Sequence, residues 1–172
     1  MDANILLWIQ DNLRNPVLNS IFKVVTNFGS EYAIILICIC LLLFKKTRKA
    51  GILCTIALLL SVGTTSLIVK PLVARPRPYE VVTGLTSVIG PEVEYSFPSG
   101  HTNATFTIAI IFWYVYGKKI GISALIVASL VAFSRLYVGV HYPTDILGGI
   151  CFALLFSTLV WKGYKKYDRS RV

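Results

Sequence analysis

The chain has 172 residues, 55% of them hydrophobic, and a mean hydropathy of +0.70. This is the size of one domain, but the composition is too apolar for an ordinary soluble domain. The formal net charge of +9 comes from basic residues gathered between apolar segments. That distribution is typical of membrane topology and argues against an RNA or DNA partner.

Residues 1–28 carry apolar side chains at helical spacing, with the pair Asn15-Pro16 as a break in the middle. Three charged residues interrupt the pattern: Asp11, Arg14 and Lys23. We expect two amphipathic helices that lie in the membrane interface. The alternative is an imperfect first membrane span, which would raise the total to six. No cleavable signal peptide is predicted, because Asp2 stands where a basic region belongs.

Later apolar runs are long enough to cross a bilayer. Four of them contain no acidic or basic residue apart from a terminal histidine: 50–69, 101–117, 120–134 and 146–161. A span needs about 20 residues, so their polar flanks would lie in the headgroups. A fifth run, 29–44, is adequate if Glu31 lies at the interface. The sequence therefore predicts an all-α, polytopic membrane helix bundle with about five transmembrane helices, as one domain over 1–172.

Basic residues set the orientation. They form three clusters: Lys45, Lys46, Arg48 and Lys49; Lys118 and Lys119; and Lys162, Lys165, Lys166, Arg169 and Arg171 in the tail 162–172. With five spans the three clusters share one face, which the positive-inside rule makes cytoplasmic. The segment 70–101 is then an outer loop.

The cysteines predict no metal site. All four lie inside apolar segments, where a free thiol behaves as a small hydrophobe: Cys38, Cys40, Cys54 and Cys151. None has the spacing with a histidine partner that a zinc site needs.

The outer loop begins with two cations, Lys70 and Arg77, around a proline-rich stretch. Three prolines predict extended backbone there: Pro71, Pro76 and Pro78. A rigid loop that displays cations favours an anion site, while anchoring to lipid headgroups is the alternative. No conformation is predicted for 79–97, and three acidic residues in it are interpreted as solvated: Glu80, Glu92 and Glu94.

A second motif, Pro98-Ser99-Gly100-His101, directly precedes an uncharged helical run. Ser99 suits the N-cap position, and the free amides at Gly100 and His101 would bind an anion with help from the helix dipole. Glycine lets a ligand approach the backbone closely. An ordinary capped helix with an interfacial histidine is the alternative.

The third motif joins Ser134-Arg135 to His141 and Asp145. Pro143 suits the first turn of the last helix, so the Asp145 carboxylate can reach one imidazole nitrogen. That contact would leave the other nitrogen free as a nucleophile. A surface histidine bonded to a helix-capping acid is the alternative.

Together the three motifs resemble the type 2 phosphatidic acid phosphatase family, which shares its site with vanadium haloperoxidases. The family pattern is matched by Lys70 to Arg77-Pro78, by Pro98 to His101, and by Ser134-Arg135 to His141 to Asp145. The resemblance implies that His141 forms a phosphohistidine, oriented by Asp145, and that His101 protonates the leaving oxygen. It implies that the phosphoryl oxygens are held by a further set: Lys70, Arg77, Ser99, Gly100 and Arg135.

The resemblance also implies a substrate class. Short bacterial members of this shape resemble undecaprenyl diphosphate phosphatases, which recycle the carrier of cell-wall synthesis. Phosphatidylglycerophosphate, phosphatidic acid and lipid A 1-phosphate are alternative substrates, and a phosphotransferase or a non-enzymatic binder of anionic lipid are alternative functions. We expect an enzyme of the bacterial cytoplasmic membrane with its site on the extracytoplasmic face. No metal or cofactor is expected, because the cations supply the positive charge. The oligomeric state stays open.

Overall fold

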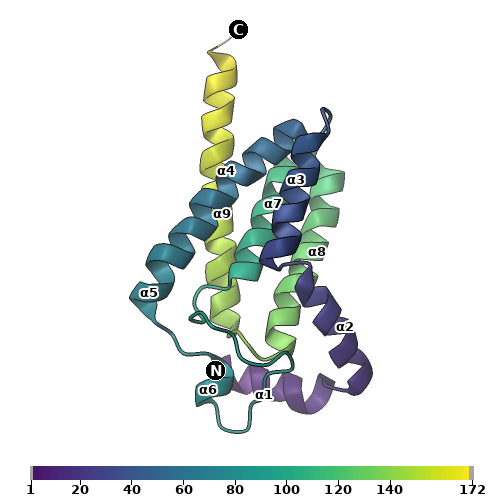
Figure 1. Cartoon of the computed structure of the whole chain (residues 1–172), viewed down its shortest axis with the longest axis vertical. Helices are drawn as coiled ribbons and strands as arrows, with labels where there is room; N and C mark the ends of the chain where they lie inside the picture. Colours follow the sequence, from purple (N-terminus) through teal and green to yellow (C-terminus); the bar gives the residue numbers. More distant parts are fainter. Residues whose placement is uncertain (1, 171–172) are drawn as a thin grey trace.

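The computed structural model describes residues 2–170, and within them every regular element is a helix (Figure 1). Arg171, the last basic residue of the tail, lies outside this range. The elements are α1 (Asp2–Leu13), α2 (Pro16–Asn27), α3 (Glu31–Leu43), α4 (Arg48–Thr64), the π-helix η1 (Thr65–Val69), α5 (Lys70–Val73), α6 (Pro78–Val81), α7 (Gly100–Tyr116), α8 (Lys118–Tyr137) and α9 (Pro143–Arg169).

Helix α7 is the centre of the bundle and packs against α4, α8 and α9. One apolar cluster joins it to α3 and α4 through buried residues that include Ile34, Ala57 and Ile111. A second cluster joins it to α8 and α9 through Ala128 and Ala153, among others. Small residues at these contacts let the helices approach closely.

The outer surface of the bundle is apolar. Large exposed hydrophobic side chains occur on every long outer helix, for example Leu36, Leu59, Ile126 and Leu155. Such a continuous apolar surface requires a nonpolar surrounding such as lipid. Within residues 2–170, three helical stretches are long and apolar enough to cross a membrane: Arg48–Val81, Lys118–Tyr137 and Pro143–Arg169.

The predicted run 29–44 does not form one straight span. Most of this run forms α3, which has only 13 residues. Helix α3 lies at an angle of 48° to α2. Helices α2 and α3 are a fourth candidate membrane span only if the two are taken together as one broken span. The break has a local cause, because Ser30 caps α3 by accepting a hydrogen bond from the amide of Ala33 at 3.3 Å.

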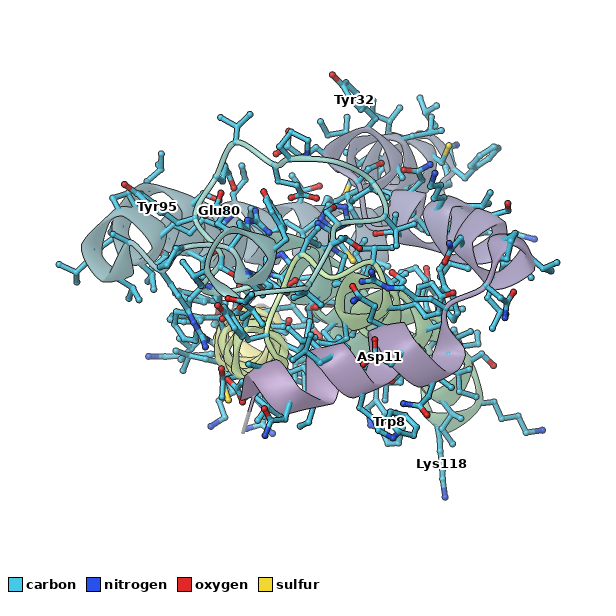
Figure 2. All side chains as sticks on the ribbon, turned by 90° about the horizontal axis from the view of Figure 1, so that it is seen from below. Trp8, Asp11, Tyr32, Glu80, Tyr95 and Lys118 are labelled. Atoms are coloured by element: carbon cyan, nitrogen blue, oxygen red, sulfur yellow. The ribbon has the colours of Figure 1, made fainter. Side chains whose placement is uncertain are left out.

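The two predicted N-terminal helices are present as α1 and α2. Asn15 caps α2 by accepting from the amide of Leu18 at 2.9 Å, and Pro16 occupies its first turn. Helix α1 lies across one end of the bundle, with Trp8 directed away from the rest of the molecule (Figure 2). The predicted break at Asn15-Pro16 is therefore confirmed.

The proline-rich stretch differs from the prediction. The π-helix η1 leads at Lys70 directly into the short helix α5, so the backbone at Pro71 is helical rather than extended. Extended backbone is found only further on, at Arg77, with φ −69° and ψ 147°. Pro71 has no N–H, and the widened π turn comes where the ordinary helical bonding is already interrupted. Ala74, at a φ of 46°, ends α5, and Pro78 then begins α6.

Candidate active site

The three motifs meet at the end of the bundle that α1 crosses. Lys70 begins α5, Ser99 caps α7, Arg135 lies in the last turn of α8, and Asp145 lies in the first turn of α9. The amide of Ser99 donates to the carbonyl oxygen of Asp145 at 3.1 Å. This bond fixes the start of α7 directly against the start of α9.

A glycine makes this close approach possible. A Cβ added at Gly149 would lie 2.8 Å from the carbonyl oxygen of Ser99, which is closer than real Cβ contacts. Only glycine therefore lets α9 lie this near the second motif.

A cavity of about 420 Å³ opens at this point. Five of the predicted site residues line it: Lys70, Arg77, Gly100, His101 and His141. Its other walls come from α3 and α4 and are largely apolar, including Ile34, Leu58 and Val62. The cavity thus combines polar groups that can bind an anion with apolar walls that can bury a hydrophobic group.

Arg77 contacts His141 directly. Nη1 of Arg77 lies 2.9 Å from Nε2 of His141 and also donates to the carbonyl oxygen of Val140 at 3.0 Å. The same Nη1 is 3.5 Å from Nδ1 and so contacts the face of the ring. The carboxylate of Asp145, which can only accept when ionised, lies 3.4 Å from Nδ1 and favours the ring proton on that nitrogen. Nε2 is therefore the nitrogen with the lone pair, as a nucleophile requires.

The Nδ1 side of His141 faces Asp145. Oδ2 of Asp145 is 3.4 Å from Nδ1, within ion-pair distance but longer than a close hydrogen bond. The same oxygen accepts from the amide of Tyr142 at 2.8 Å and from the hydroxyl of Ser96 at 2.5 Å. The carboxylate is held beside Nδ1 by several donors.

Burial and positive neighbours keep His141 neutral. The ring is 1% exposed, and desolvation, followed by the charges of Arg77 and Arg135, lowers its pKa well below the ordinary value. At neutral pH the imidazole therefore keeps its lone pair.

Glu92 is not solvated, contrary to the sequence prediction. Its carboxylate bridges two of the cations, with Oε2 at 3.1 Å from Nη2 of Arg77 and Oε1 against Nη2 of Arg135. Burial alone raises the pKa of Glu92, but the charges of Arg135 and Arg77 outweigh it and lower the pKa to about 2. The carboxylate is thus fully ionised between two arginines.

Glu94 is likewise paired, with Nζ of Lys70. The Lys70 side chain is 6% exposed, whereas that of Glu94 is 52% exposed. Glu80, the third acidic residue of this loop, accepts from the amide of Arg77 at 2.8 Å and so caps α6. All three glutamates interpreted as solvated have specific partners, which sequence spacing did not reveal.

Arg135 keeps one donor free. Its Nη1 donates to the hydroxyl of Thr26 at 2.7 Å, but its buried Nε has no hydrogen-bond partner among the residues that the structure describes. A buried, unpaired guanidinium N–H is costly, and an anion oxygen is its natural partner.

Ser99 and Gly100 differ in their access to an anion bound in the cavity. The Ser99 hydroxyl is fully buried and accepts from Thr102, at 3.4 Å from the amide and 3.0 Å from the hydroxyl. Its predicted N-cap position is therefore confirmed, and it does not line the cavity. Gly100 does line the cavity, and a Cβ added there would meet nothing within 4 Å. The free space is at the Gly100 backbone.

Four of the described residues outside the motif set also belong to the site: Glu92, Glu94, Ser96 and Arg75. Ser96 and Arg75 both contact Asp145. Arg75 carried a signal in the sequence, since it is a further cation two residues before Arg77. Ser96 carried none, because nothing in its spacing marks a partner 49 residues away.

A family model described as the PAP2 superfamily matches residues 49–169, a range that contains all three motifs. An undecaprenyl-diphosphatase of Sulfolobus acidocaldarius is 35% identical over 134 residues, which are 77% of this chain and 64% of that protein. The chain therefore spans less than two thirds of the length of that relative. Undecaprenyl-diphosphatase BcrC of Bacillus subtilis is 32% identical over 153 residues, 86% of this chain and 76% of BcrC.

A solved structure agrees with these relatives. The crystal structure of a transmembrane PAP2-type phosphatidylglycerolphosphate phosphatase from Bacillus subtilis is similar, with a TM-score of 0.74 and 30% identity. The similarity covers 96% of this chain and 85% of that one. The family resemblance expected from the motifs is confirmed.

Proposed function

This chain belongs to the PAP2 superfamily and is a multi-pass membrane lipid phosphatase of that family, and from that membership we propose that it hydrolyses undecaprenyl diphosphate to undecaprenyl phosphate. Two relatives named as undecaprenyl-diphosphatases support this substrate. The observation that carries the proposal is the cavity, because it joins the cations and both histidines to an apolar wall.

The cavity suits an amphiphile. The phosphate would lie between Lys70, Arg77 and the Gly100 backbone, and the lipid chain would leave between α3 and α4, whose cavity-lining residues include Ile35 and Leu59. Leu59 is 71% exposed, so this wall continues onto the apolar outer surface. A soluble phosphate ester would leave the apolar wall unused.

The proposed reaction has two steps. In the first, Nε2 of His141 bonds to phosphorus while the bond from phosphorus to the leaving oxygen breaks, and His101 gives that oxygen a proton. In the second, the oxygen of water bonds to phosphorus while the bond from phosphorus to Nε2 of His141 breaks, His101 takes a proton from the water, and inorganic phosphate is released. Lys70, Arg77 and Arg135, with the Gly100 amide, would neutralise the transferring group without a metal ion.

We propose five transmembrane segments with the site on the extracytoplasmic face. Helix α7, with 17 residues, would cross because it lies at the centre of the bundle, and α3 would cross together with part of α2. The clusters at Lys45, Lys118 and Lys162 would lie in the cytoplasm. The part of segment 1–28 that precedes the crossing portion of α2 would lie in the outer interface, 70–101 would form the outer loop, and 1–172 would be one domain.

Phosphate release is the direct test. The purified protein in detergent would receive undecaprenyl diphosphate, phosphatidylglycerophosphate, phosphatidic acid or lipid A, each with and without EDTA. We expect the fastest release from undecaprenyl diphosphate, no loss with EDTA, and no release by a folded His141→Ala variant. Phosphatidylglycerophosphate is the second candidate, because the similar Bacillus subtilis structure is named for it.

Labelled phosphate would separate hydrolysis from transfer. Label from the substrate should be trapped on His141 and then appear as inorganic phosphate with water as the only acceptor. A product that requires another acceptor would indicate a phosphotransferase. Absence of phosphate release from every lipid would overturn the enzyme proposal in favour of simple lipid binding.

Gly63 offers a test of the apolar wall. This α4 residue lines the cavity, and a Cβ added there would meet nothing within 4 Å. Gly63→Phe should obstruct the lipid chain and lower turnover of undecaprenyl diphosphate by about tenfold or more, while a water-soluble short-chain phosphate is still cleaved. Gly163→Phe is the matched control, since Gly163 also has open space but lies outside the cavity. Equal loss for both substrates would contradict this route.

A further inference from the structure

Two residues outside the family motifs hold the Asp145 carboxylate. We propose that Ser96 and Arg75 are positioning residues, which act through Asp145 to fix the tautomer and orientation of His141. This inference rests on the proposed function, because it concerns the same nucleophile.

Ser96 contacts both the carboxylate and the imidazole. Its hydroxyl donates to Oδ2 of Asp145 at 2.5 Å and is 3.5 Å from Nδ1 of His141. The residue is fully buried, and its amide donates to the carbonyl oxygen of Arg75 at 2.9 Å. A buried serine with its backbone and hydroxyl both bound has one fixed geometry, so it limits where Oδ2 can lie.

Arg75 holds the other carboxylate oxygen. Nη1 of Arg75 is 2.6 Å from Oδ1 of Asp145, and the guanidinium lies 3.8 Å from the centroid of the Tyr142 ring. The same group donates to the hydroxyl of Thr144 at 2.7 Å, and its Nη2 lies 3.2 Å from Oδ2 of Asp2 in α1. Arg75 is thus clamped from α1, from the start of α9 and by an aromatic face.

These contacts matter at the moment of reaction. When Nε2 bonds to phosphorus and the leaving oxygen departs, the imidazole acquires positive charge while its proton stays on Nδ1. An ionised carboxylate held beside Nδ1 stabilises that charge, and one that rotates away does not. Neither Ser96 nor Arg75 lines the cavity. They should therefore affect kcat and leave KM nearly unchanged.

A double-mutant cycle tests the inference. Ser96→Ala and Arg75→Met should each lower kcat for undecaprenyl diphosphate by about 10- to 100-fold, with KM within about twofold, and Arg75→Lys should recover part of the loss. In an Asp145→Asn background the same two changes should have no further effect, because they act through the carboxylate. Melting temperatures in detergent would show that each variant is folded.

The outcomes separate this inference from the proposed function. If the wild-type protein releases no phosphate from any lipid, the proposed function fails. If the wild type is active and both variants match it, or if their effects multiply with that of Asp145→Asn, the positioning roles are wrong. If Ser96→Ala does not fold, Arg75→Met and Arg75→Lys decide alone, because the Arg75 side chain is 28% exposed and easier to replace.

Discussion

Glu92 and Glu94 pair with all three cations that the motifs bring to the site. Without them, Lys70, Arg77 and Arg135 would repel one another in a poorly solvated space. The two carboxylates therefore stabilise the three cations, and a bound phosphate would compete with them. We expect competition between the loop carboxylates and a bound phosphate to be measurable at Glu94, the less buried of the two glutamates.

Glu94→Gln should strengthen inhibition by inorganic phosphate. The change frees Lys70 from its partner, and the pair is worth about 1 kcal/mol or less because the Glu94 side chain is 52% exposed. The inhibition constant should fall by up to about fivefold. Asp11→Asn is the control, since it removes the same charge from α1 outside the cavity. Identical inhibition constants for the two variants would show that Glu94 does not compete with phosphate.

His141 should make stability depend on pH. Its pKa in the folded protein is well below the ordinary value near 6.5, so the unfolded chain binds a proton first as pH falls. The contribution is complete above about pH 6.5 and decreases below it, by up to about 1.4 kcal/mol per pH unit. Melting temperatures at pH 7.5, 6.5 and 5.5 should fall more steeply for wild type than for His141→Gln. Parallel curves would contradict a neutral buried ring.

At the scale of elements, the sequence predicted the helix ends that short-range interactions determine. The break at Asn15-Pro16, the cap at Ser99 and the start of α9 at Pro143 follow from short-range hydrogen bonding and proline geometry, so the sequence located them. The roles of Glu92 and Ser96 depend on partners in distant segments. Spacing along one chain does not encode those contacts, and the motifs alone therefore gave an incomplete site.

Asn103 links α7 to α4 inside the bundle. It accepts from the hydroxyl of Ser61 at 2.6 Å and donates to that of Thr65 at 3.1 Å, next to the π turn. Asn103→Ala would leave both buried hydroxyls without this partner and should lower the free energy of unfolding by about 1–3 kcal/mol. Thermal unfolding in detergent would measure it. Asn12→Ala, at an exposed position of α1, should have little effect; an equally small effect at Asn103 would show that the link is dispensable.

At the scale of the whole molecule, topology decides which compartment the site faces. Val93 is fully exposed in the loop 70–101, and Lys118 begins α8 after α7. With the native cysteines replaced by alanine, Val93→Cys in intact cells should react with a membrane-impermeant maleimide, and Lys118→Cys only after permeabilisation. Labelling of both from one side would show that α7 does not cross. The reverse pattern would place the site in the cytoplasm.

The pairing of the loop carboxylates with the site cations has a consequence for selection among phosphates. Free phosphate would have to compete with Glu92 and Glu94 at its low concentration in solution. A lipid phosphate whose chain already lies against the apolar wall between α3 and α4 would compete with them as a tethered group. Tethering raises the effective concentration of an anion to about the millimolar range or above without any new contact. We therefore expect the protein to select phosphates by their attached lipid chain. Abundant soluble phosphates would be excluded because they cannot compete with the two glutamates, and the substrate would enter from the bilayer.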